Sequence, residues 1–292
     1  MTVMDALVGP FASYGFMRRA LVGCFALSLG SAPLGVFLIQ RRMSLMGDAM
    51  AHAILPGAAV GYLVAGLSLF AMTVGGLVAG LAVALLAGLV SRTTPLREDA
   101  SFAAFYLVSL GLGVLLISLK GSNIDLLRVL FGSVLALDDA AILLVAGVAS
   151  TTLFALALGY RMLVGECFDR GFMASVGGRG GLAHIVFLAL VVLNLVAGFQ
   201  ALGTLMVVGL MMLPAAAASF WSPTLAGQIG VAVLIGAISS AAGLLASYHA
   251  HLAASPAIVL SAGLLYVASL IVGPHGGLLR RPALRPRPAL LP

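Results

Sequence analysis

The sequence predicts an all-α fold: a polytopic integral membrane bundle of eight or nine transmembrane helices, with one short re-entrant or interfacial helix. Two observations predict it. Hydrophobic residues make up 62% of the 292-residue chain and charged residues only 8%, whereas soluble domains carry roughly 25% charged residues. The hydrophobic residues also gather in runs of about 20, which is the length that a helix needs to cross roughly 30 Å of hydrocarbon.

Nine hydrophobic runs are candidates for membrane spans. They lie near residues 21–40, 47–66, 70–90, 100–118, 139–160, 183–200, 201–221, 225–247 and 256–273. The junction near Gln200 is too tight for two ordinary helices, so one of the spans beside it is expected to be broken or short. Segment 123–137 is apolar but too short to cross, which predicts the re-entrant or interfacial helix. Asp138 and Asp139 are expected to cap the helix that follows it.

The arginines lie between and beside these runs. Because positive residues concentrate in cytoplasmic loops, segments 41–46, 91–99 and 161–182 and the C-terminal tail are predicted to share the cytoplasmic side. That arrangement requires segment 123–137 not to cross the membrane, and it leaves the side of the N-terminus open. It also accounts for the net charge of +6 without nucleic-acid binding.

The domain organisation is simple. Residues 1–280 are predicted to form a single transmembrane domain. Residues 281–292 alternate Pro, Arg, Ala and Leu, which predicts a disordered basic tail. The two cysteines, Cys24 and Cys167, lie far apart in different contexts, so neither a disulfide framework nor a cysteine metal site follows from them.

Asp48 and His52 are the most informative polar residues, because they stand at the start of an apolar run. Ionisable groups inside a membrane segment are costly and usually face the bundle interior or a water-filled path. Residues at i and i+4 share one helix face, with Cβ atoms about 5–6 Å apart. Carboxylate and imidazole are both good ligands for a divalent first-row metal. The alternative is that Asp48 belongs to a helix N-cap, with Ser44 and Gly47 starting the helix.

Two further features bear on a metal site at this pair. Pro56 and Gly57 follow His52 closely, which predicts a bent helix of the kind that lines a cavity. Two ligands are too few, since structural zinc usually takes four. A symmetric dimer would bring Asp48 and His52 of each copy to a two-fold axis, giving two nitrogen and two oxygen ligands that suit Zn(II) and do not exclude Mn(II).

His249 and His251 form a second, weaker pair of candidate metal ligands at the end of another span. An H-x-H pair can bind metal, and the competing interpretation is that both imidazoles are simply solvated.

The chain lacks a nucleotide-binding loop of the form G-x-x-x-x-G-K-[ST] and the hydrolase motifs H-E-x-x-H and G-x-S-x-G. It is therefore not predicted to be an enzyme, and energy for pumping would come from another subunit. The 161–182 loop is where such a subunit would bind. Phe168, Phe172 and Val176 are spaced as one face of a short helix that could dock into a partner, the alternative being a plain loop on the membrane surface.

The chain resembles the membrane permease subunits of bacterial ABC-type zinc/manganese importers. The resemblance rests on four groups of residues. The first and strongest comprises Pro33-Leu34-Gly35 with Phe37, Arg41-Arg42-Met43, Gly47-Asp48 with His52, and Pro56-Gly57. The other three are Asp125-Leu126 with Leu130-Phe131-Gly132, Gly203-Thr204-Leu205 with Leu213-Pro214-Ala215-Ala216, and Phe168-Asp169 with Gly177. Together these cover roughly residues 15–273.

The resemblance implies a multi-pass permease of the bacterial inner membrane, with an aqueous path between two copies of the chain. It implies that Asp48 and His52 bind the transported Zn²⁺ or Mn²⁺, with no covalently bound cofactor. It also implies cytoplasmic ATP-binding subunits, contacted through a coupling helix that includes Phe168, Asp169, Phe172 and Gly177, and an extracytoplasmic metal-binding protein. The alternative function is an ion-coupled secondary metal transporter, which would need carboxylates in several spans.

Overall fold

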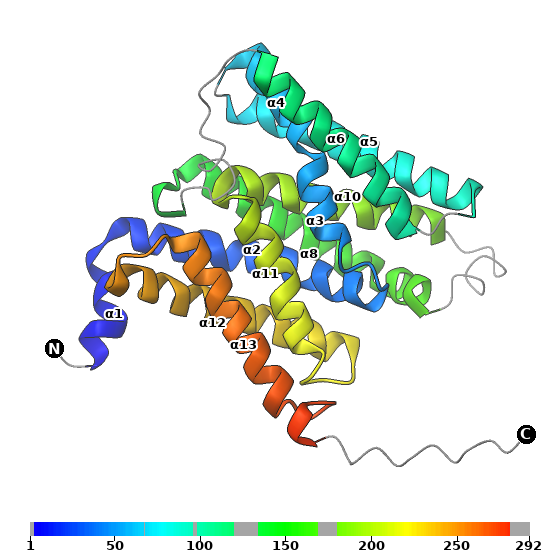
Figure 1. The fold of residues 1–292 in the computed structure, drawn as a ribbon. Helices are drawn as coiled ribbons and strands as arrows, with labels where there is room; N and C mark the ends of the chain where they lie inside the picture. The colour runs from blue at the N-terminus through cyan, green and yellow to red at the C-terminus, as the bar shows by residue number, and fades with distance from the viewer. Residues whose placement is uncertain (1–2, 67, 96–97, 120–133, 169–179, 281–292) are drawn as a thin grey trace, which may run out of the picture.

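The computed structural model describes the whole chain except residues 1–2, 67, 96–97, 120–133, 169–179 and 281–292. In the described ranges the regular structure is helical, without strands (Figure 1). The helices are α1 (Val3–Ser13), α2 (Gly15–Gln40), α3 (Met46–Ala53), α4 (Leu55–Ala65), α5 (Leu69–Thr93), α6 (Glu98–Leu119), α8 (Asp139–Phe168), α10 (Gly180–Leu202), α11 (Thr204–Ala218), α12 (Leu225–Ala250) and α13 (Ala254–Val272), with 3₁₀ turns at Val134–Ala136 and Leu278–Arg280.

Eight segments of the described chain are long and apolar enough to cross a membrane, with α3 and α4 together making one of them. This confirms the predicted polytopic helical bundle. At the tight junction near Gln200, the chain turns from α10 into α11 at Gly203, which has a φ of 93°. Helix α11 has 15 residues and extends about 22 Å, so it is the short member of the pair.

Helices α2 and α10 form the centre of the bundle. In their most apolar windows 78% and 72% of the residues are buried, against 22% in α5 and α6. Helix α2 contacts α8, α10, α11 and α12, and α4, α5 and α6 pack on one another to one side of it (Figure 1). Small residues allow the close approaches, because helices in lipid associate through backbone contact at such positions. Gly35 lies directly against the carbonyl of Met211.

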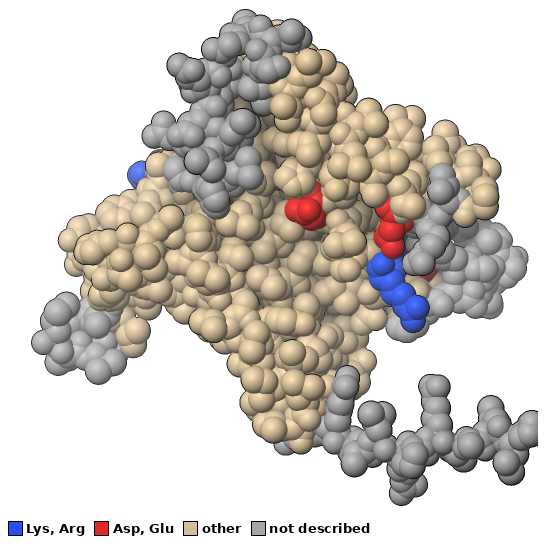
Figure 2. Space-filling view, viewed as in Figure 1, with Lys and Arg blue, Asp and Glu red and all other residues tan. Residues whose placement is uncertain are grey.

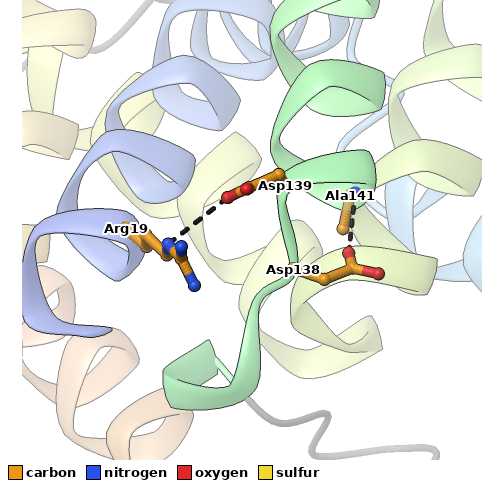
Figure 3. Close-up of polar contacts among 4 residues, drawn as sticks. All are labelled: Arg19, Asp138, Asp139 and Ala141. Carbon is orange, nitrogen blue, oxygen red and sulfur yellow. Dashed lines mark hydrogen bonds and ion pairs between the residues drawn. The ribbon is translucent and has the colours of Figure 1, made fainter. Parts of the chain in front are cut away.

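The start of α8 lies beside the start of α2. Asp138 Oδ1 accepts a hydrogen bond from the Ala141 amide (2.8 Å), which confirms Asp138 as a cap, and Asp139 pairs with Arg19 across 3.3 Å (Figure 3). The other ends of these helices also meet, because Arg41 donates to Cys167 Sγ (3.3 Å). Helices α2 and α8 are therefore parallel. We call the end of the bundle that holds Arg41 the arginine end.

Helix α6 runs away from the arginine end, parallel to α3 and α4. Its Asp99 shares a cavity with Leu45, and its Ser109 hydroxyl donates to the Ala53 carbonyl (2.9 Å). The described segments before and after residues 120–133 thus both lie at the end opposite Arg41. That is what a non-crossing segment 123–137 requires, although most of this predicted interfacial helix falls outside the described residues.

The described parts of the three arginine-bearing connections lie at the arginine end, as predicted. The predicted 161–182 loop is shorter than expected, because α8 continues to Phe168 and α10 begins at Gly180. Arg41 contacts both of these helices, at Cys167 and at His184. Many large hydrophobic side chains are exposed on the bundle, and the face in Figure 2 shows few charged side chains among its described residues. The predicted limits of the tail lie outside the described residues, so the division into one domain and a tail stays a prediction.

The contact between α4 and α5 yields a stability prediction. A Cβ at Gly75 would strike the carbonyl of Gly57 on the facing helix, whereas one at Gly88, also on α5, would meet nothing within 4 Å. We expect Gly75→Ala to lower the free energy of unfolding by about 1–3 kcal/mol through overpacking. Gly88→Ala is the matched control. Thermal unfolding in detergent checks this, and equal stability of the two variants would contradict the packing argument.

Candidate metal-transport site

A tight turn between α2 and α3 sets the position of Asp48. Arg42 adopts the left-handed conformation (φ 58°), the Arg42 amide donates to the Ile39 carbonyl, and the Met43 amide donates to the Leu38 carbonyl, both at 2.9 Å. This is a Schellman motif, which usually has glycine at the left-handed position. Leu38 and Met43 are both buried, as the hydrophobic contact of the motif requires. The turn fixes the direction in which α3 leaves.

Asp48 and His52 share one face of α3. The N-cap residue of α3 is Leu45, without a side-chain cap, so the alternative in which Asp48 serves as the N-cap is wrong. Asp48 Oδ1 lies 3.7 Å from His52 Nε2, and the two side chains are 64% and 27% exposed. For a metal ion about 2.1 Å from each atom, the ligand–metal–ligand angle would be about 120°, near the tetrahedral value. The pair can therefore chelate one ion after small side-chain adjustments.

The helix is interrupted directly after His52. Helix α3 ends at Ala53 and α4 begins at Leu55, with Pro56 in its first turn, so the predicted distortion at Pro56 is confirmed. The Ser109 hydroxyl of α6 donates to the Ala53 carbonyl, which supplies a partner for backbone at the break. The break at Ile54 thus lies two residues beyond His52 and is tied to α6.

Helix α6 also forms the wall that faces Asp48. A cavity of about 160 Å³ is lined by Leu45, Met46, Asp48 and Ala49 of α3 and by Asp99, Phe102, Ala103 and Tyr106 of α6. The Tyr106 ring stacks on the His52 ring, with centroids 6.4 Å apart and planes 30° apart. His52 Nδ1 is buried and has no hydrogen-bond partner among the described residues. The neighbouring Tyr106 ring, together with the Asp48 carboxylate near Nε2, therefore limits the orientation of this imidazole.

The structure does not bring other predicted ligands to this pair. Within the described ranges no group of three or more His, Cys, Asp or Glu is arranged to hold a metal. His249 and His251 line a different cavity of about 420 Å³ with Phe16 and Met17, near the end of the bundle opposite Arg41. Their metal role stays a prediction, separate from the α3 pair.

The predicted partner-binding residues are only partly described. Phe168 is the last residue of α8, and Asp169, Phe172, Val176 and Gly177 lie outside the described residues. The structure adds a cluster that sequence reasoning missed. Arg41 reaches Cys167 and His184, which are more than 120 positions away in the chain. Spacing in the sequence gives no signal for contacts of this kind.

Comparison with known proteins gives a consistent result. Residues 13–273 match the model of the ABC 3 transport family. The manganese import system permease protein ScaB of Streptococcus parasanguinis is 31% identical over 272 residues, covering 93% of this chain and 96% of that protein. The zinc transport system membrane protein TroC of Treponema pallidum is 30% identical, covering 99% of each chain. The structure of PsaBC from Streptococcus pneumoniae in complex with Fab has a TM-score of 0.82 and 28% identity, covering 95% of this chain and 99% of that one.

The turn before α3 generates a second prediction. A non-glycine residue in the left-handed region is strained by roughly 1–2 kcal/mol, and glycine recovers part of this at some cost in unfolded-state entropy. We expect Arg42→Gly to raise the free energy of unfolding by about 0.5–1 kcal/mol. Arg42→Ala removes the same charge but keeps the strain, so it should not stabilise. Denaturant titration in detergent compares them, and equal stabilisation by both variants would refute the conformational explanation.

Proposed function

The chain belongs to the ABC 3 transport family, and we propose that it is the membrane permease of an importer for a divalent transition metal, zinc or manganese. The observation that carries this proposal is the Asp48–His52 pair on α3, whose Oδ1 and Nε2 atoms lie 3.7 Å apart beside a cavity. An acid and an imidazole inside a membrane span are costly unless they serve a polar path. Transport of a metal ion past them accounts for both groups.

A second copy of the chain completes the site in this proposal. One chain supplies two ligands, and its described residues offer no third. Asp48 is 64% exposed, so it is accessible to a partner chain. Two copies related by a two-fold axis would give two imidazoles and two carboxylates. Such a set can hold an ion during transit and release it, because Asp48 also lines a cavity together with Asp99 of α6.

The nature of the ligands limits the cargo. Imidazole suits zinc, and carboxylate suits manganese, so a mixed set binds both. Soft thiolate ligands, which select Cu(I), are absent from the cavity lining. The named relatives include manganese and zinc systems, which agrees with a site of this mixed character.

The remaining parts of the importer follow from the orientation of the bundle. With the arginine end in the cytoplasm, Asp48 lies about one helical turn from that side, and the start of α2 lies on the opposite side. A separate ATP-binding subunit would contact the chain between α8 and α10, at Phe168, Asp169, Phe172 and Gly177. An extracytoplasmic metal-binding protein would deliver the ion to the other face.

Removing either ligand should abolish metal binding and transport. We expect Asp48→Asn and His52→Gln, each of which removes two of four ligands in a dimer, to weaken binding of Mn²⁺ and Zn²⁺ by at least about 100-fold. Isothermal titration of the purified permease and uptake by proteoliposomes containing the ATP-binding subunit measure this. The controls are Asp139→Asn and His275→Gln, which change exposed residues outside the cavity lining.

Wild-type affinity in both ligand variants would refute the site. Uptake that needs an ion gradient but no ATP would instead favour the secondary transporter, since an ABC importer transports in the absence of a gradient when ATP is supplied.

The dimer is tested separately. Mixed dimers with one Asp48→Asn copy should lose affinity as well, because both copies contribute ligands.

Tyr106 gives a finer prediction about the same site. Since its ring orients His52, we expect Tyr106→Ala to weaken Mn²⁺ and Zn²⁺ binding by about 3–10-fold, the equivalent of one aromatic contact. Tyr106→Phe keeps the ring and should bind as the wild type does. Titration of both variants under identical conditions checks this. A loss in Tyr106→Phe as large as in Tyr106→Ala would show that the hydroxyl, and not stacking, matters.

A further inference from the structure

Arg41 is held by three neutral groups at the arginine end of the bundle. Its Nε donates to Cys167 Sγ (3.3 Å), and its Nη1 donates to His184 Nδ1 (3.0 Å). Its guanidinium carbon lies 4.5 Å from the centroid of the Phe187 ring. Because Arg can only donate, His184 must accept through an unprotonated Nδ1. Arg41 is the C-cap residue of α2, so its side chain joins the end of α2 to α8 and to α10.

These contacts do not use all of the hydrogen-bond donors of Arg41. Among the described residues no carboxylate forms an ion pair with Arg41, and its Nη2 is buried without a hydrogen-bond partner. A buried donor left unpaired is destabilising. The partners are a thiol, an imidazole and an aromatic face, each of which binds a guanidinium more weakly than a carboxylate does. Such a set can be exchanged for another at modest cost.

The position of the cluster suggests its role. Cys167 stands next to the end of α8 and His184 lies in the first turns of α10, so they flank residues 169–179 on both sides. On the other side, Arg41 precedes the Schellman turn that fixes α3, and Asp48 follows seven residues later. Any movement of the ends of α8 and α10 relative to α2 must stretch or break the Arg41 contacts.

We propose that Arg41 is a positioning residue that couples the segment between α8 and α10, where the ATP-binding subunit would dock, to the Asp48–His52 pair on α3. This inference rests on the proposed function. The Arg41 contacts are made in one state of the transport cycle and exchanged in the other, so that displacement of α8 and α10 changes the direction of α3. Energetic coupling of two sites requires contacts that differ between two states, and exchange of the Arg41 contacts would supply that difference.

The test uses the permease assembled with its ATP-binding subunit in proteoliposomes. We expect Arg41→Gln to lower the number of Mn²⁺ or Zn²⁺ ions transported per ATP hydrolysed by at least about 10-fold, while the metal dissociation constant changes by less than about 2-fold. Arg41→Lys keeps the charge but loses the fork, and should be intermediate. Arg42→Gln changes the adjacent, exposed arginine and is the matched control.

Cys167 provides a second readout that needs no metal. It is half-buried beside Arg41, whereas Cys24 is fully buried and should not react. In the wild-type complex, maleimide labelling of Cys167 should change by at least about 3-fold between the nucleotide-free and the ATP–vanadate states. In Arg41→Gln it should be fast and equal in both, and Cys167→Ser identifies the labelled residue.

The outcomes are distinct. A wild-type transport ratio in Arg41→Gln, or labelling that still responds to nucleotide in that variant, overturns the coupling role. Loss of metal affinity in proportion to transport also overturns it, because Arg41 would then act on the site itself. If the wild-type complex neither binds nor transports metal, the proposed function fails, and the labelling of Cys167 still decides whether Arg41 links α8 to α2.

Discussion

The rest of the structure depends on one constraint: Asp48 and His52 lie on a membrane-spanning helix and must avoid lipid without being neutralised by a permanent partner. A tight ion pair would satisfy both groups, but the 3.7 Å separation of Oδ1 and Nε2 exceeds hydrogen-bond distance. A permanent pair would also compete with a metal ion for the same atoms. The bundle instead keeps Asp48 at a cavity, with His52 loosely paired to it, and in the proposed function this is where an ion would bind and leave.

The neighbouring helices meet this constraint in different ways. Helix α6 supplies the Tyr106 ring against His52 and the Ser109 hydroxyl at the break after α3. Small residues let the neighbouring helices approach closely, as at Gly57 of α4 and Gly75 of α5, so the helices next to α3 pack tightly on one another. The turn at Arg42 accepts backbone strain to give α3 a fixed direction. Polar function in this membrane protein thus rests on apolar packing at a few close contacts.

Much of this could be predicted from the sequence, because each signal is local. Runs of about 20 apolar residues predict spans, arginine placement predicts the shared end, and Pro56 predicts the break. The i, i+4 spacing brings Asp48 and His52 to one face without any knowledge of the fold. The contacts of Tyr106 and Arg41 could not be predicted, since they join helices that are distant in the chain and depend on crossing angles. Likewise, nothing local excludes Asp48 as a cap, because only the position of Leu45 shows where α3 begins.

Arg41 and His52 lie at the two ends of one short chain segment. Different kinds of side-chain contact hold them in place. The His52 ring stacks on Tyr106 and its Nε2 lies 3.7 Å from Asp48 Oδ1, so in the proposed site the imidazole is oriented without a tight bond that an ion would have to break. Arg41 joins α2 to α8 and α10 through neutral partners and keeps one donor unpaired, which in the proposed coupling role would allow these helices to move. A carboxylate at Cys167 or His184 would bind the guanidinium more strongly and would resist that movement. Weak, directional contacts at both ends of one short segment are what a permease needs if motion at the arginine end is to reach the ion.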